Sequence, residues 1–180
     1  RGRPTPAVVA DEYYCSQVHP LVYDCLTVER WRALNRFAAT AGLSLVFGLN
    51  GCLGRRSRRS PVDVASFARF FHDTAAARLH VWAFELGNEL TGHYAGSDGV
   101  APEALGADVH ALSRALERAW PNKADRPKLL GPDVAAFTAG KELPAYFHAF
   151  LRAAAGAPAL HGVTFHQYPY CSRADSTAAT

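Results

Sequence analysis

The stretch Val81-Trp-Ala-Phe-Glu-Leu-Gly-Asn-Glu89 decides the fold of this chain. It predicts a short buried strand that ends on an adjacent amide and carboxylate, Asn88 and Glu89. Alternation places Glu85 and Glu89 among small residues on one face and bulky apolar residues on the other. The first face suits a barrel interior that opens into a pocket, and the second suits contact with helices. At about 3.3 Å per residue, Glu85 would lie about 13 Å below Glu89, so Glu89 is the stronger candidate for chemistry.

Further strand-like runs alternate with amphipathic helical patterns along the chain. The other strands are expected at 43–48, at 128–131, where Pro132-Asp133 would stop the strand, and at 163–168. Helices are expected over 31–38, 61–71, 105–116 and 143–151, the second of them opened by a capping box that begins at Ser60. This order predicts an α/β fold with a parallel sheet of about four to five βα units. A closed (β/α)8 barrel needs about 250 residues, so we expect a partial, incomplete TIM barrel.

The composition describes a globular chain. It has 180 residues, of which 49% are hydrophobic and 19% charged, with a net charge of +3 that is too weak to indicate nucleic acid binding. No apolar run has the roughly 18 residues of a transmembrane helix, and the first residues lack the order of a signal peptide. The chain contains no Met, so we expect an internal piece of a longer protein. We expect an irregular segment at 1–26, the partial barrel at 27–170 and a polar tail at 171–180.

The four cysteines do not indicate a metal site. Cys15, Cys25, Cys52 and Cys171 lack the close spacing of zinc ligands, and the histidines lack a ligand spacing as well. Free thiols and one or more disulfides stay equally open. We therefore expect no metal site.

Glu89 is the candidate catalytic residue, because a carboxyl group in a partly apolar pocket can act as a general acid. Asn88 would then donate a hydrogen bond to a substrate hydroxyl. The alternative is a surface glutamate that caps the next element.

Polar residues at two other strand ends are candidate substrate contacts. His166 and Tyr168 alternate onto one face at the end of the last predicted strand, where they could point into the same barrel mouth as Glu89. Asn50 follows the first strand. The alternatives are a satisfied core histidine and a turn residue, respectively.

A basic run follows Asn50 in the same strand-to-helix connection. Arg55, Arg56, Arg58 and Arg59 would lie on the face where the pocket opens and could bind an acidic chain. The alternative is a solvated loop.

Four motifs occur here in the order and spacing of one known family. They are Leu45-Val-Phe-Gly-Leu-Asn50, Phe84-Glu-Leu-Gly-Asn-Glu-Leu90, Leu130-Gly-Pro-Asp133 and Phe165-His-Gln-Tyr168. The chain resembles the heparanase-like endo-β-glucuronidases of glycoside hydrolase family 79, in their plant and algal form. The resemblance implies a (β/α)8 barrel with an appended β-sandwich, retaining hydrolysis of β-glucuronosidic bonds without a cofactor, and a secreted, cell-wall, vacuolar or lysosomal location.

The resemblance also implies roles for single residues. Glu89 matches the family's proton donor, Asn88 the amide before it, and His166 and Tyr168 the aromatic pair on the sixth barrel strand, with Tyr168 near the nucleophile. The nucleophilic glutamate of the family lies on the seventh strand, beyond this chain. No Glu follows Glu142, so we expect the isolated chain to be inactive. A paired basic motif of animal heparanases is also absent after Asp133, which argues against heparan sulfate as the substrate.

Two other functions stay open on this scaffold. One is a non-catalytic protein that binds acidic polysaccharide. The other is a different retaining β-glycosidase of the same clan, since an Asn-Glu strand end is shared widely there. A nucleotide-binding domain is disfavoured because no Gly-rich phosphate loop follows a predicted strand.

Overall fold

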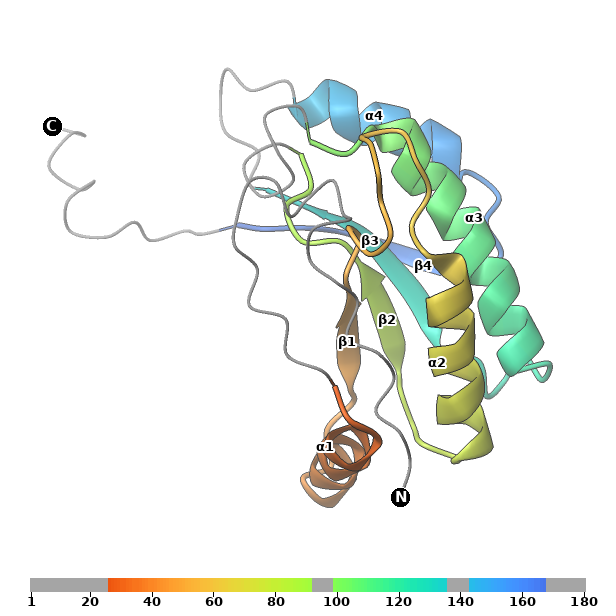
Figure 1. Ribbon diagram of the computed structural model, residues 1–180. Coiled ribbons are helices and arrows are strands. Elements are labelled where there is room, and N and C mark those ends of the chain that lie inside the picture. The colour runs from red at the N-terminus through yellow and green to blue at the C-terminus, as the bar shows by residue number, and fades with distance from the viewer. Residues whose placement is uncertain (1–25, 92–98, 136–142, 168–180) are drawn as a thin grey trace, which may run out of the picture.

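A parallel sheet covered by helices forms the body of the molecule, as the computed structural model of residues 26–91, 99–135 and 143–167 shows (Figure 1). The elements follow in the order α1 (Val28–Thr40), β1 (Val46–Leu49), α2 (Val64–Ala76), β2 (Ala83–Leu86), α3 (Pro102–Ala119), β3 (Lys128–Val134), α4 (Leu143–Ala154) and β4 (Leu160–Phe165). The predicted alternation of strands and helices is confirmed.

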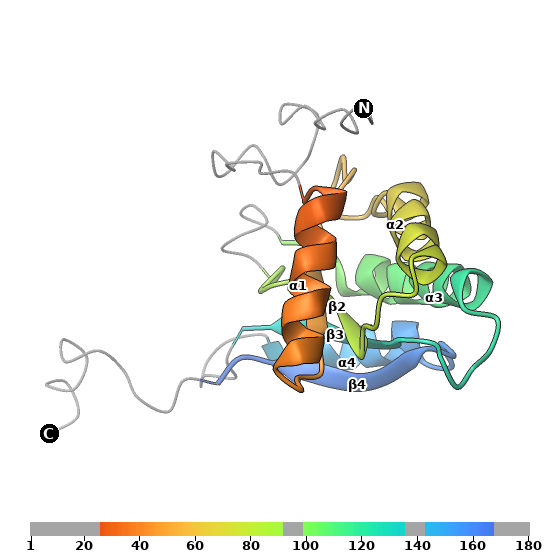
Figure 2. The same cartoon turned by 90° about the horizontal axis from the view of Figure 1, so that it is seen from below.

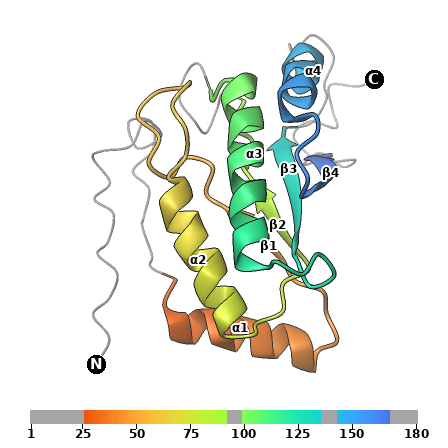
Figure 3. The same cartoon turned by 90° about the vertical axis from the view of Figure 1, so that its right-hand side faces the viewer.

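The strand order identifies the sheet as part of a barrel. The four strands lie side by side in chain order, β1-β2-β3-β4, and every neighbouring pair is parallel. Helices α2, α3 and α4 lie next to one another over a single face (Figures 1 and 3). A doubly wound sheet would reverse its strand order and carry helices on both faces. Sequential strands with helices outside are the arrangement of (β/α)8 barrels, so the expected partial barrel is confirmed.

The core fills the space between the sheet and α2 and α3. Phe84 and Leu86 of β2 are fully buried on the helix-covered face, as the alternation predicted. The ring of Phe84 lies 4.7 Å from that of Phe71 on α2 and 6.4 Å from that of Trp120 after α3. Burying a phenylalanine completely is worth about 1.5–3 kcal/mol, so these contacts fix β2 against the helices.

Helix α1 closes the end of the sheet near β1 and is in the foreground when the molecule is seen from below (Figure 2). Trp31 anchors it, with its ring 4.7 Å from Phe47 of β1 and 5.1 Å from Phe70 of α2. The indole N–H donates to the hydroxyl of Thr74 at 3.0 Å. One aromatic side chain therefore joins α1 to both neighbouring elements.

Trp82 does not lie under the helices, contrary to its predicted place in the alternation. Its side chain is 38% exposed, and the ammonium group of Lys128 lies 4.2 Å from the centre of its ring. The backbone N–H groups of Trp82 and Ala83 both donate to the carbonyl of Leu45. This shared acceptor breaks the regular pairing, so β2 begins only at Ala83.

The predicted start of α2 at Ser60-Pro61 is also wrong. The helix begins at Val64, and the carboxylate of Asp63 caps it by accepting from the backbone N–H of Ser66 at 3.1 Å. The hydroxyl of Ser60 accepts instead from the N–H groups of Arg56 and Ser57, at 2.8 and 2.9 Å. Val62 and Asp63 stay outside the helix because their N–H groups donate to distant partners, the carboxylate of Asp108 and the carbonyl of Leu53, respectively.

Pro132 and Asp133 do not stop β3, which continues to Val134. Proline has no N–H to donate, so the pairing with β4 is irregular between Gly131 and Val134 and then resumes at Phe165. The Gly131–Pro132 peptide bond is cis. Strand β4 begins three residues earlier than predicted, at Leu160, and ends at Phe165.

Apolar side chains remain exposed on the two outer strands of the described sheet. Val46 on β1 is 42% exposed, and Val163 and Phe165 on β4 are 43% and 50% exposed. Within the described residues each of these strands has a neighbour on one side only.

Cys52 is disulfide-bonded, and the other three cysteines lie outside the described residues. The predicted polar tail and all of the predicted N-terminal segment except Leu26 also lie outside them. Among the helices that the structure describes, none has the length and apolarity to span a membrane.

Candidate active site

The chain turns sharply after β2, and this turn places Glu89. Gly87 has a φ of +108° and Glu89 a φ of +49°. A Cβ atom at Gly87 would lie 2.7 Å from the carbonyl oxygen of Pro132, so only glycine fits there. The N–H of Glu89 donates to the carbonyl of Asp133 at 2.7 Å. Glu89 is thus attached to the end of β3 by its backbone before its side chain makes any contact.

Three side chains from neighbouring strand ends form a hydrogen-bonded cluster. Nδ1 of His166 lies 2.5 Å from Oε1 of Glu89, and Nε2 of the same ring lies 3.0 Å from Oδ1 of Asp133. The side chains are 19%, 25% and 11% exposed for Glu89, His166 and Asp133, respectively. The predicted proximity of Glu89 and His166 is therefore present. We call these residues the Glu89–His166–Asp133 triad.

Backbone contacts hold the triad in place. The N–H of Asp133 donates to the hydroxyl of Thr164 at 3.1 Å, and the N–H of His166 donates to the carbonyl of Val134 at 2.8 Å. Asp133 has a φ of +50°, and so, like Glu89, it has a left-handed backbone without being glycine. Such a conformation costs about 1–2 kcal/mol per residue and persists where the surroundings enforce it. Two such positions in direct contact mark a constrained site.

Asp133 was missed as a site residue, because the proline before it indicated only the end of a strand. Its signal was nevertheless present. Asp133 is an acidic residue at a strand end, the feature that singled out Glu89, and it belongs to the Leu130-Gly-Pro-Asp133 motif.

The electrostatics of the triad favour bound protons. Burial raises the pKa of Asp133, the charges of Glu85 and Glu89 raise it further, and His166 opposes them. The pKa of His166 is raised mainly by its hydrogen bond to Glu89, with burial opposing and the charges of Asp133, Glu89 and Glu85 adding to the rise. Both groups therefore hold their protons to higher pH than usual.

Glu85 takes part in this field although it lies within β2. It is half-buried on the helix-free face, in register with Gly48 of β1 and Leu130 of β3. Its effect on the pKa of Asp133 exceeds that of Glu89. The prediction that set Glu85 aside considered only its distance from Glu89 along the strand and not its electrostatic effect on Asp133 of the neighbouring strand.

The other residues predicted to contact substrate, Asn88, Asn50 and Tyr168, differ in where the structure places them. The side chain of Asn88 is exposed beside Glu89. Asn50 forms a turn, as its alternative reading held, since its side-chain oxygen accepts from the N–H of Cys52 at 3.0 Å. Tyr168 lies outside the described residues.

Arg55 is not part of an exposed basic patch, and its prediction as a glycan contact is wrong. Its side chain is 0% exposed and forms an ion pair with Asp108 of α3, which is 1% exposed. It also donates to the carbonyls of Gly51, at 2.8 Å, and Ser60. The burial of Arg55 could not be predicted from the run of arginines, because its acidic partner Asp108 is 53 residues away in the sequence. Arg56, Arg58 and Arg59 are exposed, as predicted.

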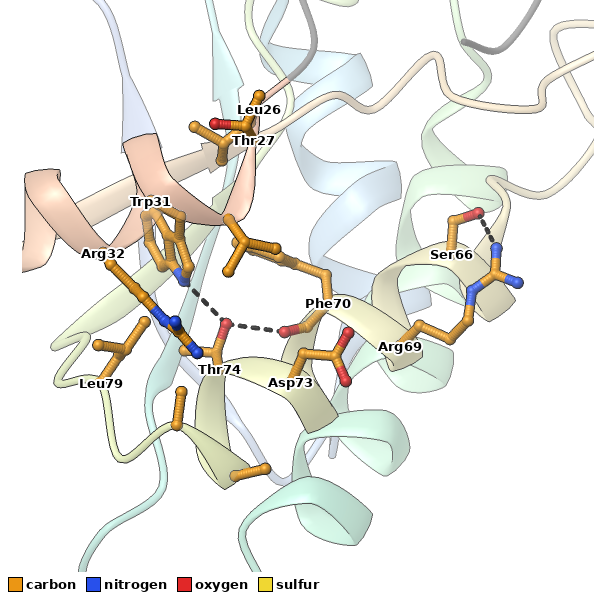
Figure 4. A pocket seen from close by; sticks show the side chains of 13 residues that line it. Leu26, Thr27, Trp31, Arg32, Ser66, Arg69, Phe70, Asp73, Thr74 and Leu79 are labelled. Carbon is orange, nitrogen blue, oxygen red and sulfur yellow. Dashed lines mark hydrogen bonds between the residues drawn. The ribbon is translucent and has the colours of Figure 1, made fainter. Parts of the chain in front are cut away.

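A separate groove of about 700 Å³ lies between α1 and α2 (Figure 4). Trp31, Arg32, Asp73 and Thr74 are among its lining residues, and all of the lining residues belong to the two helices or their ends. Figure 4 shows the hydrogen bond from Trp31 to Thr74 inside it, continued by the bond from the Thr74 hydroxyl to the carbonyl of Phe70. The groove contains no residue of the triad.

No three His, Cys, Asp or Glu side chains are arranged to bind a metal ion in the part of the chain that the structure describes.

Parallel strands in barrel order, with two carboxyl groups and an imidazole gathered at their carboxyl ends, define a segment of an α/β barrel with a polar cluster at the end where such barrels place their sites. The profile described as "Glycosyl hydrolase family 79, N-terminal domain" matches residues 12–179, so the chain belongs to glycosyl hydrolase family 79. The family resemblance expected from the four motifs is confirmed.

Two curated relatives are similar to parts of the chain. Heparanase-like protein 3 of Arabidopsis thaliana is 31% identical over 116 residues, which are 60% of this chain and 21% of the relative. Baicalin-beta-D-glucuronidase of Scutellaria baicalensis is 26% identical over 171 residues, 84% of this chain and 30% of the relative. The chain thus spans about a fifth to a third of the length of these relatives.

Proposed function

We propose that this chain is the acid-bearing part of a retaining β-glucuronidase barrel and that Glu89 is its general acid and base. One observation carries the proposal: the carboxyl group of Glu89 stands at the end of β2, mostly shielded from water and bonded to His166. Family membership supports a glycosidase, and the relative named for baicalin β-D-glucuronide supports a glucuronoside as the substrate.

The reaction would be a double displacement. Glu89 gives its proton to the glycosidic oxygen as the C1–O bond breaks, while a second carboxylate attacks C1 from the opposite side. Glu89 then takes a proton from the water that releases the sugar. The two carboxyl groups must lie about 5–5.5 Å apart. The resemblance assigns the second one to the seventh barrel strand, outside this chain.

Asp133 is a poor candidate for that second carboxylate. Burial and two neighbouring carboxylates raise its pKa, which disfavours the ionised form that attacks carbon. Its Oδ1 also bonds the same imidazole that holds Glu89. Asp133 is better suited to act through His166.

Acidic glycans or small glucuronides are the proposed substrates. Arg56, Arg58 and Arg59 are exposed in the connection after β1, on the side where parallel strands end, and could bind further acidic sugars of a polymer. The disulfide of Cys52 supports a secreted, cell-wall, vacuolar or lysosomal location, because disulfides persist in oxidising compartments.

The test is the Glu89→Gln variant of the full-length protein, assayed on two glucuronides that differ only in their leaving group. Loss of proton donation should lower kcat/KM by about 10²–10⁴-fold for an alkyl leaving group. Formation of the glycosyl-enzyme from a nitrophenyl glucuronide should change little, because that leaving group needs no proton. The exposed residue Glu29, on α1, provides the control variant Glu29→Gln, which should match wild type.

Equal losses on both substrates, or none, would contradict the role of Glu89. The exposed arginines favour one second candidate, a protein that binds acidic polysaccharide without cleaving it. Binding that depends on these arginines, with no turnover of any glucuronide by the full-length protein, would support that candidate. Preferred cleavage of neutral β-glycosides would instead indicate another glycosidase activity on the same barrel.

A further inference from the structure

We propose that His166 and Asp133 are positioning residues that orient Glu89 and exchange protons with it during the reaction; this rests on the proposed role of Glu89. The inference starts from the continuous contact between Glu89 Oε1, the two nitrogens of His166 and Asp133 Oδ1. It concerns the two residues that do not touch the glycosidic bond themselves.

The two contacts of the ring require two protons between three groups. A neutral imidazole carries one N–H, so it can donate to only one of its two carboxyl partners. For both contacts to be hydrogen bonds, the second proton lies on the ring, making an imidazolium, or on one of the carboxyl groups. Each arrangement has the same number of protons and differs only in where they lie. The triad therefore titrates as one unit.

This sharing fits the chemistry proposed for Glu89. Its Oε1 is bonded to His166, so Glu89 acts as the acid when it carries a third proton, on Oε2, in addition to the two protons that hold the contacts of the ring. As the glycosidic bond breaks, that proton passes to the leaving oxygen and Glu89 becomes negative. The N–H at Nδ1 stabilises the new charge through Oε1, and a proton on Asp133 can move to Nε2 at the same time. The steps reverse when water returns a proton to Glu89, so no proton is gained or lost over the cycle.

The backbone makes the same connection independently. The carbonyl of Asp133 accepts from the N–H of Glu89 at 2.7 Å, while its side chain bonds the ring of His166. Asp133 therefore holds Glu89 both directly and through the imidazole. The left-handed backbone of both residues brings these groups into contact.

The charges around His166 favour retention of a proton. Glu85, Glu89 and Asp133 all face it electrostatically, from β2 and the ends of β2 and β3. Three carboxyl groups around one imidazole let a proton stay on the ring or on Asp133 to higher pH than is usual for these groups. That proton is the one that the proposal moves.

The experiment uses Asp133→Asn in the full-length protein, which preserves size and removes the titrating carboxyl group. We expect kcat/KM for the alkyl glucuronide to fall by about 10²-fold and that for the nitrophenyl glucuronide by less than about tenfold. The alkaline limb of the pH profile should move to lower pH, because the triad has lost a negative charge that held its protons. Magnetic resonance of ring-labelled histidine should show a lower pKa for His166.

Two further variants separate positioning from folding. His161 is exposed on β4, the strand that ends directly before His166. His161→Asn is therefore a matched control that should leave the pH profile unchanged. His166→Asn keeps a donor near Glu89 but has no second ring nitrogen. In that background, Asp133→Asn should have little further effect on kcat/KM, since neighbours that act as a unit are not additive. If Asp133→Asn does not fold, His166→Asn carries the same leaving-group and pH comparison.

The results distinguish this inference from the proposed function. If the wild type turns over glucuronides and Glu89→Gln behaves as described, an unchanged pH limb with equal losses on both substrates in Asp133→Asn overturns only the proton exchange. If the wild type turns over no glucuronide, the proposed function fails. The histidine titration still decides whether Asp133 and His166 share protons, and an unaltered titration in Asp133→Asn refutes it.

Discussion

Arg55 and Asp108 form an ion pair from which water is excluded, and this pair joins the connection after β1 to the middle of α3. The carboxylate of Asp108 also accepts the N–H of Val62 at 3.2 Å. Burial raises the pKa of Asp108, while the charge and hydrogen bond of Arg55 act in the opposite direction. The pair therefore fixes the loop that presents Arg56, Arg58 and Arg59.

Removing one partner of this pair should destabilise the fold strongly. Asp108→Ala leaves a buried guanidinium without its counter-charge, which costs about 3–5 kcal/mol. The free energy of unfolding, measured with denaturant on the full-length protein, checks this. The partly exposed pair of Arg126 and Glu117 provides the control Glu117→Ala, which should cost less than about 1 kcal/mol. Similar losses for the two variants would show that burial does not matter here.

Replacing Arg56, Arg58 and Arg59 together by glutamine should weaken binding of acidic polymers selectively. These side chains are exposed, so fold stability should stay within about 0.5 kcal/mol of wild type. We expect KM for a glucuronate-containing polymer to rise at low salt and the difference to shrink at high salt, because exposed charges are screened. KM for a small glucuronide should not change. An equal rise for both substrates would place these arginines in the sugar-binding pocket itself.

Gly87→Ala should damage the candidate site more than a glycine replacement elsewhere. The added Cβ would meet the carbonyl of Pro132 at 2.7 Å and disfavour the φ of +108°. Gly156, at φ +78° with nothing within 4 Å of its added Cβ, isolates the backbone effect, and Gly156→Ala should cost about 1–2 kcal/mol. We expect a larger loss of stability and of turnover in Gly87→Ala. Equal unfolding free energies for the two variants would contradict the clash.

The stability of the protein should decline as pH rises through the titration of the triad. The raised pKa of His166 contributes stability that is complete below the ordinary histidine pKa of 6.5 and is lost as pH rises through the folded value. The raised pKa of Asp133 likewise favours the fold at low pH, and that contribution is lost between 3.8 and its folded value. The denaturation midpoints of wild type and His166→Asn, measured from below pH 6.5 upward, should therefore converge as the pH becomes alkaline. Parallel curves would show that His166 titrates alike in both states.

Sequence patterns predicted element types better than element ends. The apolar face of 81–89 and the helical spacing elsewhere follow from local periodicity, which the core preserved at Phe84 and Leu86. The start of α2 was misplaced because Val62 and Asp63 have hydrogen-bond partners distant in the sequence. No local pattern contains such partners. The irregular pairing after Gly131 could not be predicted for the same reason, because its partner strand, β4, is distant in the sequence.

Site residues were predictable where the sequence marks the end of a strand. They were not predictable where contacts with distant residues decide the position of a side chain. Glu89 and His166 follow from strand ends, and parallel neighbours bring such ends together. Asp133 was not predicted as a site residue because the proline before it indicated that the strand had ended, whereas β3 continues to Val134. The burial of Arg55 was not predicted because a run of arginines usually forms a solvated loop. Only the ion pair with the distant Asp108 places this side chain in the core.

The outer strands of the sheet, as far as the described residues show them, affect how the protein should be handled in the laboratory. Val163 and Phe165 stand beside backbone groups of β4 that the described strands leave open on one side. An exposed apolar strand edge favours the attachment of a second molecule by β-augmentation and the growth of insoluble assemblies. Val163→Lys should therefore lower the tendency of the protein to aggregate at high concentration, which light scattering of wild type and variant would measure.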